Sequence, residues 1–572
     1  MRKLLMPIAV AASLSVAAST LVAQTTANEH NCPSTQAIPP FVGTGSGPFS
    51  PNQSLCLPQL APVPTGLSPL AFIVQGVEPG ARVDSEGTVY VVSIRGVPGG
   101  VDLWRWNGTL DGPPNSNGTL PFKYEGQPDN CGIYSFTNGG CANNVGTETN
   151  LGVAPGGGDA DIAVNRLDPT TGTPNLPLTS LTLAPGVTGT HSTDRGDNFS
   201  PPNVAAAAIP GDDRQWMEAT DPKTVYLTYH DISTFNIDVQ RSIDGGLTYA
   251  AGAGEAIDPQ TFPAAGALTP TSTANLAAQI KIDYGSCPSR GNLYQLFIAP
   301  DNALENAAGQ PMRDAYIGVS VDAKLGLPAF TFTDYKVYTG PKGANNANIF
   351  PALAVDQFGF LYAVWSDNSN IFFTSSSDLG KTWTPARVVN QGTTVGKANV
   401  FPWVAADANG HVVVAWLGAN KAGNSNDRAV MEPGHTPEDN GPCTQGTTCM
   451  TKWAKWNVYA LETVNGHAAK PRFTQYTASD HVIHRGTIST GGLGGNADRN
   501  LADFFQVALD PQHRASISFA DDHVVSPLSL RRTGTDNPDD PVSFRVGVPY
   551  FTYRLQPPAG VVTTGSCAGA AQ

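Results

Sequence analysis

The sequence predicts an all-β fold, a six- or seven-bladed β-propeller of four-stranded antiparallel blades, with the number of repeated modules favouring seven. Three observations predict it. Charged residues make up only 14% of the chain, while 60 Gly and 47 Pro supply the turns that many short strands need. A strand–Asp–turn–strand module recurs with a period of about 50 residues. A second motif, Ser-x-Asp-x-Gly-x-Thr followed by an aromatic residue, recurs between these modules.

The first 23 residues predict a secretory signal peptide. Arg2 and Lys3 precede an apolar run over residues 4–22, and cleavage is expected after Ala23. A membrane anchor is the alternative, but Pro7 interrupts the run, a polar segment follows it, and no other long apolar stretch occurs. We therefore expect an exported protein, extracellular or periplasmic, that does not insert into a membrane.

The eight cysteines of an exported chain predict disulfide bonds. Cys131–Cys141 and Cys443–Cys449 each bracket a short loop, and Cys32–Cys56 would pin the N-terminal segment. The remaining two cysteines are left for a long-range bond, Cys287–Cys567. A zinc site is the alternative, and the lack of a Cys-x₂-Cys spacing or a neighbouring His disfavours it.

Residues 24–74 are rich in Pro, Ser and Thr and lack hydrophobic periodicity, which predicts a tail or an irregular wrap over the domain. The repeated modules occupy residues 75–555, and residues 556–572 form an expected C-terminal tail. Each module is an apolar strand that ends near an Asp and is followed by a turn and a Val/Tyr/Trp-rich strand. The module aspartates are Asp84, Asp161, Asp221, Asp283, Asp356, Asp407 and Asp510. We expect residues 546–554 to close the ring by adding a strand to the first blade. Separate β-sandwiches are the alternative, but no linker divides the modules.

The second motif has its best copies at residues 376–383 and 242–249, and a weaker copy at 192–199 has Asn198 in place of Thr. Its Asp can accept hydrogen bonds from nearby backbone N–H groups, its Gly supplies a positive φ, and its aromatic residue packs beneath the turn. We interpret four residues as structural: Asp194, Asp244, Asp378 and Trp383. The motif resembles the Asp-box, or BNR repeat, of the sialidase-like β-propeller superfamily, and the resemblance extends over residues 75–555. Six blades would match that superfamily.

Propellers bind ligands on the face where the chain enters the innermost strands, so polar residues before each module are the site candidates. The candidate substrate-binding residues are Arg214, Trp216, Asn348, Asn399, Arg499 and Asp503. The resemblance implies exo-glycoside hydrolysis of a terminal, sialic or other acidic, sugar. It implies that Arg214 binds the sugar carboxylate together with Arg499, Arg485 or Arg82. It also implies a Tyr nucleophile paired with a Glu, and an Asp acid/base, which we assign to Tyr229 (or Tyr284), Glu218 and Asp213. None of the arginines lies in the Phe-Arg-Ile-Pro sequence of sialidases.

The net charge of −14 disfavours nucleic acid as a partner. The resemblance implies a glycan or glycoconjugate as the partner, and we expect it to be bound by a monomer. No cofactor is required. A structural Ca²⁺ at the loop 367–370 is an alternative. No metal site is expected at His481 and His484, because their spacing points them to opposite faces of a strand. A non-catalytic glycan- or protein-binding propeller is the alternative function, and a structural protein is a third. Three arginines in one pocket would favour the hydrolase, whereas arginines held in salt bridges would favour binding.

Overall fold

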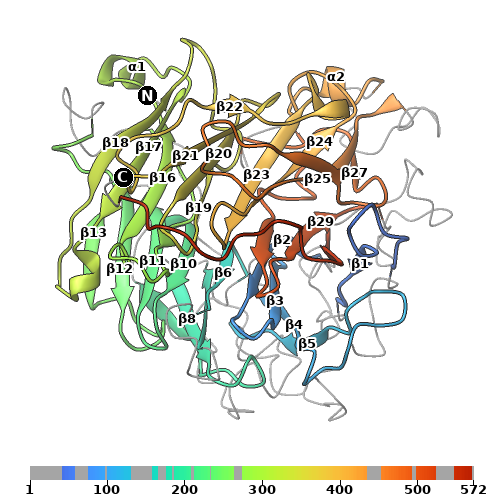
Figure 1. Cartoon of the computed structure of the whole chain (residues 1–572), viewed down its shortest axis with the longest axis horizontal. Helices are drawn as coiled ribbons and strands as arrows, with labels where there is room; N and C mark the ends of the chain where they lie inside the picture. Colours follow the sequence, from blue (N-terminus) through green and yellow to red (C-terminus); the bar gives the residue numbers. More distant parts are fainter. Residues whose placement is uncertain are drawn as a thin grey trace, which may run out of the picture.

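Seven antiparallel sheets follow one another along the described part of the chain and form a ring (Figure 1). The computed structural model describes residues 41–57, 75–96, 100–129, 157–164, 175–182, 186–207, 212–231, 233–262, 274–434, 452–491, 497–523 and 547–569. The first strand of each sheet contacts the first strand of the next, and the first strand of the seventh contacts that of the first. The protein is therefore a seven-bladed β-propeller with its strands ordered from the centre outward. The seven expected modules correspond to the seven blades.

Blades 1 to 3 share the simple order of consecutive antiparallel strands, whereas in blade 4 two short inner strands both pair with the same next strand. Blade 1 contains β2 (Val77–Val83), β3 (Val89–Ile94), β4 (Val101–Trp106) and β5 (Lys123–Gly126). Blade 2 contains β6 (Ala160–Ile162), β7 (Leu176–Leu181), β8 (Val187–Ser192) and β9 (Asn203–Ala207). Blade 3 contains β10 (Asp212–Ala219), β11 (Val225–Asp231), β12 (Ile237–Ser242) and β13 (Gly252–Glu255). Blade 4 contains β14 (Leu276–Ala277), β15 (Lys281–Ile282), β16 (Leu293–Ala299), α1 (Ala303–Ala307), β17 (Asp314–Ser320), the 3₁₀ turn η3 (Ala323–Leu325) and β18 (Thr333–Thr339).

Blades 5 to 7 continue this order, and the last one also takes a strand from the N-terminal segment. Blade 5 contains β19 (Ala352–Val355), β20 (Leu361–Ser366), β21 (Ile371–Ser376) and β22 (Arg387–Val388), and the 3₁₀ turn η4 (Gly392–Thr394) follows it. Blade 6 contains β23 (Asn399–Ala406), β24 (Val412–Ala419), α2 (Arg428–Met431), β25 (Lys455–Thr463), β26 (Thr474–Thr477) and β27 (His484–Arg485). Blade 7 contains β28 (Gln506–Leu509), β29 (Ala515–Asp521), β30 (Val548–Tyr553) and β1 (Gln53–Ser54).

The second strands are among the most completely buried elements, because each has a strand on both sides and a neighbouring blade on both faces. Every residue of β3, β16, β20 and β24 is buried, and these strands are rich in Val, Leu, Tyr and Trp. Such near-continuous apolar strands suit a sheet that is covered on both faces. The hydrophobic core is thus distributed between the blades around the ring.

The turns between first and second strands, called first turns here, lie at one end of the ring. In most first turns the module aspartate follows the first strand and caps the turn; Asp356 Oδ1, for example, accepts from the N–H groups of Phe358 (2.9 Å) and Phe360 (3.1 Å). Asp161 differs, because it lies within β6. We call the end of the ring that holds the first turns the turn face, and the opposite end, where the chain enters the first strands, the entry face.

The three copies of the Ser-Asp-Gly motif form turns between the third and fourth strands of blades 2, 3 and 5. In the best copy Asp378 Oδ1 accepts from Ser376 Oγ (2.9 Å) and Thr382 N–H (2.8 Å), and Oδ2 accepts from Thr382 Oγ1 (2.6 Å). Gly380 has the positive φ of 87° that the turn requires. Trp383 closes this turn with a hydrogen bond to its Gly carbonyl (3.0 Å).

The corresponding aspartates of the other copies, Asp194 and Asp244, make the same kind of contacts. In the weaker copy Asn198 replaces Thr, and its side-chain amide donates to Asp194 Oδ2 (2.7 Å). These turns lie on the turn face, so the aspartates are remote from the entry face.

The ring closes with strands from both ends of the chain. Within β1, Gln53 pairs with Phe551 and Ser54 with Tyr550 of β30, so that β1 is the outermost strand of blade 7. The expectation that residues 546–554 add a strand to the first blade is wrong, because β30 is the third strand of blade 7. Two residues from the segment expected to be a tail or wrap complete that blade.

The C-terminal segment crosses the middle of the view in Figure 1 and lies on the turn face. The carbonyl of Val562 accepts a hydrogen bond from the Asn409 N–H of blade 6 (2.9 Å). The Cys287–Cys567 disulfide links the segment to blade 4, which confirms that expected pair. Cys56 is also disulfide-bonded. The signal peptide and the other expected cysteine pairs involve residues outside the described ranges. None of the helices in those ranges is long and apolar enough to cross a membrane.

Candidate functional site

The entry face carries a group of charged side chains around the mouth of the central channel. Arg214 lies near the start of β10 and Glu78 near the start of β2, and both have positive φ angles (57° and 51°) at irregularities of their strand pairing. Such bulges redirect side chains. Asp159 and Asp503 come just before β6 and β28. Four blades therefore bring these residues together, and we call them, with Asp213 and Arg499, the mouth cluster.

Arg214 is bound by carboxylates of the protein itself. Its Nη1 lies 3.4 Å from Glu78 Oε1 and 3.2 Å from Asp159 Oδ2, and its Nη2 donates to Asp503. Arg499 holds the same Asp503 in a bidentate contact, at 2.7 and 2.8 Å. The guanidinium groups are thus paired within the cluster.

The mouth cluster contains more carboxyl groups than guanidinium groups, which affects their protonation. Burial raises the pKa of Glu78 well above its usual range, and the neighbouring Asp159 carboxylate adds to the rise. Burial raises the pKa of Asp159 to about 6, with Arg214 opposing this and Asp213 adding to it. Asp213 is half exposed, with 49% of its side chain accessible. A carboxyl group that keeps its proton up to about pH 6 therefore lies beside the solvent-facing side chain of Asp213.

Below the mouth cluster, four aromatic rings fill the channel. Trp216 packs edge-on against Phe350 (5.0 Å between ring centroids) and Phe504 (5.9 Å), and Trp403 stacks on Phe504 (5.9 Å). The guanidinium of Arg214 lies 5.2 Å from the centroid of Phe350. Trp216 is only 1% exposed, so it acts as packing beneath the mouth. We call these four rings the aromatic plug.

Below the aromatic plug, towards the turn face, the channel contains a small polar cavity of about 50 Å³. Lys281 pairs with Glu218 (2.8 Å), and Arg82 pairs with Asp161 (2.8 Å). Gln279 donates to the same Asp161 (2.9 Å). A volume of this size accommodates on the order of one or two water molecules, too little for a sugar. Glu218 and Arg82, both considered for the site, belong to this cavity and not to the mouth cluster.

The structure does not bring Tyr229 and Glu218 together as a nucleophile pair. Met217 of β10 pairs with Leu227 of β11, so these two side chains lie on the same face of the sheet. Alternate residues of a strand share a face, so Tyr229 lies on that face too, whereas Glu218, next to Met217, lies on the opposite face. Tyr229 is buried between blades 2 and 3, and its hydroxyl donates to Asp238 (3.0 Å). The other candidate, Tyr284, lines the cavity of Glu218 and donates to the Ala406 carbonyl (3.1 Å).

The two candidate asparagines brace loops of the entry face. The Asn348 amide donates to the carbonyls of Asn345 (2.9 Å) and Ser366 (3.0 Å). Asn399 is fully buried and accepts from Trp416 Nε1 (2.8 Å). These bonds hold the loops that surround the mouth, so both residues contribute to its shape and not directly to a ligand contact in this structure.

Other candidates lie elsewhere. Arg485 belongs to the short strand β27 at the outer side of blade 6. In the loop considered for Ca²⁺, Asp367 accepts from Ser369 N–H (2.9 Å), Asn370 N–H (2.7 Å) and the Asn370 amide (2.9 Å). Sequence reasoning missed Glu78 and Asp159, although the rule that found Arg214, a polar residue just before a module, applies to both.

Comparison with known proteins gives similar structures but no family. No protein-family model matches the chain, and no curated protein sequence matches it. An α-L-arabinofuranosidase from Fusarium graminearum is similar at 12% identity and a TM-score of 0.36, over 65% of this chain and 94% of that one. An ulvan-specific polysaccharide lyase has 11% identity and a TM-score of 0.39, over 83% and 94%. A lectin from Aleuria aurantia has 7% identity and a TM-score of 0.36, over 71% and 96%. At this level of similarity the activity has to be argued from the chain's own residues.

Proposed function

We propose that the protein is an exported glycoside hydrolase that removes a terminal sugar at the mouth cluster. The supporting observation is the contrast between Asp159, whose pKa is raised to about 6, and Asp213, which faces solvent beside it. A protonated carboxylic acid next to a carboxylate is the pair on which glycosidic bond cleavage depends. The aromatic plug supports cleavage of chain ends, because a sugar that enters the mouth meets a closed floor.

In this proposal Asp159 acts as the general acid. Its proton passes to the glycosidic oxygen as the bond from that oxygen to the anomeric carbon breaks. The Asp213 carboxylate stabilises the positive charge that develops on the sugar ring. Water then adds to the anomeric carbon and returns a proton to Asp159, which restores the acid.

The mouth cluster favours a neutral sugar over an acidic one. Arg214 and Arg499 are already paired with Glu78, Asp159 and Asp503, so neither guanidinium is held ready for a sugar carboxylate. Adding another anion to a cluster with surplus carboxyl groups is unfavourable. The proposed substrate class is therefore a neutral glycan, in place of the sialic acid that the sequence resemblance implies.

The test is hydrolysis of a panel of 4-methylumbelliferyl glycosides, neutral ones and the sialoside, by the wild type and by Asp159→Asn. We expect turnover of a neutral glycoside, and a loss of about 10²-fold or more in kcat for the variant. Activity of the wild type should fall as the pH rises above about 6, because Asp159 then loses the proton that it donates.

The matched control is Asp238→Asn, which replaces a carboxyl group whose pKa burial also raises to about 6, but which lies in blade 3 against Tyr229. Its kcat should equal that of the wild type. Absence of turnover on every glycoside would refute the hydrolase, and equal turnover by Asp159→Asn would refute the assignment of the acid.

Glycan binding without catalysis is the second candidate, and the paired state of Arg214 and Arg499 favours it. Calorimetric titration with neutral oligosaccharides distinguishes the two functions. Binding by wild type and Asp159→Asn alike, with no product released by either, would support the binding protein.

A further inference from the structure

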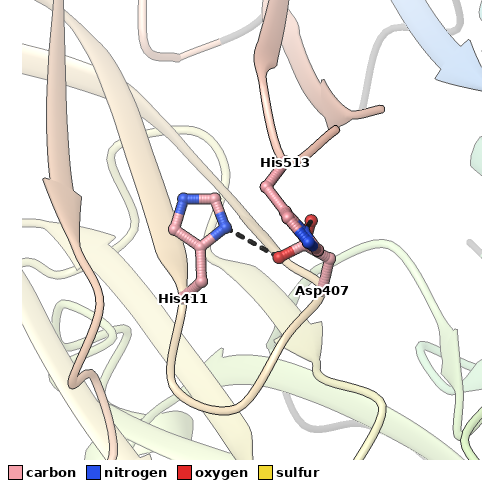
Figure 2. A group of neighbouring side chains, drawn as sticks. All are labelled: Asp407, His411 and His513. Atoms are coloured by element: carbon pink, nitrogen blue, oxygen red, sulfur yellow. Dashed lines mark hydrogen bonds and ion pairs between the residues drawn. The ribbon is translucent and has the colours of Figure 1, made fainter. Parts of the chain in front are cut away.

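Two histidines and an aspartate converge on the turn face, between blades 6 and 7. Figure 2 shows Asp407 and His411, from the first turn of blade 6, facing His513 from the first turn of blade 7. His411 Nδ1 lies 2.7 Å from Asp407 Oδ1, and His513 Nδ1 lies 2.8 Å from Asp407 Oδ2. One donor atom from each residue lies within 4.8 Å of the other two. We call these three residues the turn-face triad.

The hydrogen bonds of this first turn differ from those of its neighbours. In blade 7, Asp510 Oδ1 accepts from the N–H groups two and four residues further on, at 2.9 and 2.8 Å, as Asp356 does in blade 5. In blade 6 the corresponding N–H groups, of Asn409 and His411, donate instead to the carbonyls of Val562 (2.9 Å) and Ala408 (3.2 Å). The Asp407 carboxylate is thereby released from these two bonds and turned towards the two imidazoles.

A further carboxylate lies behind the triad. His411 is fully buried, and its second ring nitrogen, Nε2, lies 3.4 Å from Glu462 Oε1. Glu462 is itself fixed by Arg554 (3.1 Å). A carboxylate behind a histidine orients the ring so that its other nitrogen meets a metal ion. Without an ion, Glu462 and Arg554 anchor the imidazole ring of His411.

Two other groups of the described residues offer similar atoms but fit an ion less well. The first is His481, Asp521 and His523, where the ring of Phe41 contacts both imidazoles, at 4.9 and 4.6 Å between centroids. The Phe41 ring packs against one side of both imidazoles, each of which keeps 17% of its side chain exposed. The second group has only one histidine. In the turn-face triad, His513 is 26% and Asp407 17% exposed, which leaves a side open to water.

We propose that the turn-face triad binds a zinc ion, with His411 Nδ1, His513 Nδ1 and one oxygen of Asp407 as ligands and water in the fourth position. Two imidazoles and a carboxylate are a ligand set that Zn²⁺ prefers, with bonds of about 2.0–2.2 Å. A tetrahedral ion needs donor atoms about 3.3 Å apart, so each of the two His–Asp contacts, now 2.7 and 2.8 Å, opens by roughly half an ångström to admit it.

The proposed ion has a structural role. It lies on the turn face, at the opposite end of the first strands from the mouth cluster, and it joins blade 6 to the blade in which the ring closes. The C-terminal segment bonds to the same first turn through Asn409, so the ion also fixes the turn on which that segment rests.

The test is the zinc content of the full chain, measured by inductively coupled plasma mass spectrometry after gel filtration. We expect about one equivalent per chain for the wild type, and loss of at least nine-tenths of it in Asp407→Asn and in His513→Gln. Glu462→Gln should weaken zinc binding by about 10- to 100-fold. The matched control is His523→Gln, which removes the same kind of side chain from the group that packs against Phe41 and should retain the zinc.

A second measurement does not depend on variants that fold poorly. Wild-type protein treated with EDTA is titrated with Zn²⁺ in a calorimeter, and its Tm is measured with and without the ion. One site and a higher Tm support the proposal. Zinc-free wild type that shows no binding in this titration would overturn it, as would variants of the triad that keep their zinc or loss of zinc in His523→Gln alone.

Discussion

Arg214 and Glu78 show how single residues build the mouth cluster. Both lie at the same place in their blades, near the start of the first strand, and both adopt a left-handed backbone conformation that is uncommon for residues with a side chain. Residues in this conformation persist where the surrounding structure holds them. Here the holding contacts are the ion pairs of Arg214 with Glu78, Asp159 and Asp503, and the hydrogen bond from the Asp503 N–H to Glu78 Oε1. The cluster therefore depends on its own charges for its shape.

Replacing Arg214 by Met should destabilise the protein. The change leaves the buried carboxyl groups of Glu78 and Asp503 without this cation, and breaking a buried ion pair costs about 3–5 kcal/mol. The loss should be larger at pH 8 than at pH 5, because protonation relieves the uncompensated carboxylates at the lower pH. Urea unfolding at the two pH values measures the difference.

The control for this change is Arg387→Met, since the guanidinium of Arg387 donates to a backbone carbonyl at an exposed position. Its free energy of unfolding should stay within about 0.5 kcal/mol of the wild type. Equal stability of Arg214→Met and wild type at pH 8 would mean that the ion pairs of the mouth cluster do not hold it together.

At the scale of single residues, the sequence predicts which residues lie near the channel mouth better than it predicts which side chains contact one another. It correctly places Arg214 and Asp503 near the channel mouth, because both precede a recognisable strand. It fails for Tyr229 and Glu218, because the face on which a strand residue lies depends on the register with its neighbour. No local pattern in the sequence reports that register, nor the bulge that precedes Trp216 in β10.

Among the elements, the turns made by the Ser-Asp-Gly motif are self-contained. Each depends on hydrogen bonds within eight residues, so the sequence alone predicts their form. The weaker copy shows why the motif tolerates variation: the amide of Asn198 supplies the donor that a Thr hydroxyl supplies elsewhere. The strand–Asp–turn–strand modules are predictable for the same reason.

Asp378→Ala should lower the free energy of unfolding by about 1–2 kcal/mol, because the turn loses the acceptor of three hydrogen bonds at an accessible position. Glycoside turnover should not change, since this turn lies on the turn face. Differential scanning calorimetry and the glycoside assay measure the two quantities. Lys381→Ala, in the same turn but without such a bond, should leave both unchanged, and a loss of turnover in Asp378→Ala would contradict this separation of the faces.

For the whole molecule, the seven modules of the sequence favour seven blades over six, and the structure has seven, because each blade carries its own module. The Cys287–Cys567 bond is also predictable once the nearer pairs are assigned. The outer strand of blade 7 is different. Gln53 and Ser54 have no periodicity, and their partners Phe551 and Tyr550 lie near the other end of the chain. Nothing local indicates such a pairing.

Deleting residues 41–57 should make the protein associate into larger species than the full chain forms. The deletion removes β1 and leaves the edge of β30 with unpaired backbone groups, which readily pair with another chain. Size-exclusion chromatography with light scattering measures the result. Deleting only residues 24–31, which keeps β1 and both Cys32 and Cys56, is the control and should give the wild-type mass. A monomer of unchanged Tm after the longer deletion would show that β1 is dispensable for closure.

β1, the outermost strand of blade 7, is the first strand of the propeller to be synthesised and the last to find its partner strand. About 490 residues separate β1 from β30, and at 5–20 residues per second a ribosome needs roughly 25–100 s to make them. During that time β1 has no strand partner, and blade 7 cannot form. The two ends of the chain can therefore meet only when synthesis is almost complete, so the last blade to form is also the one that joins the beginning of the propeller to its end.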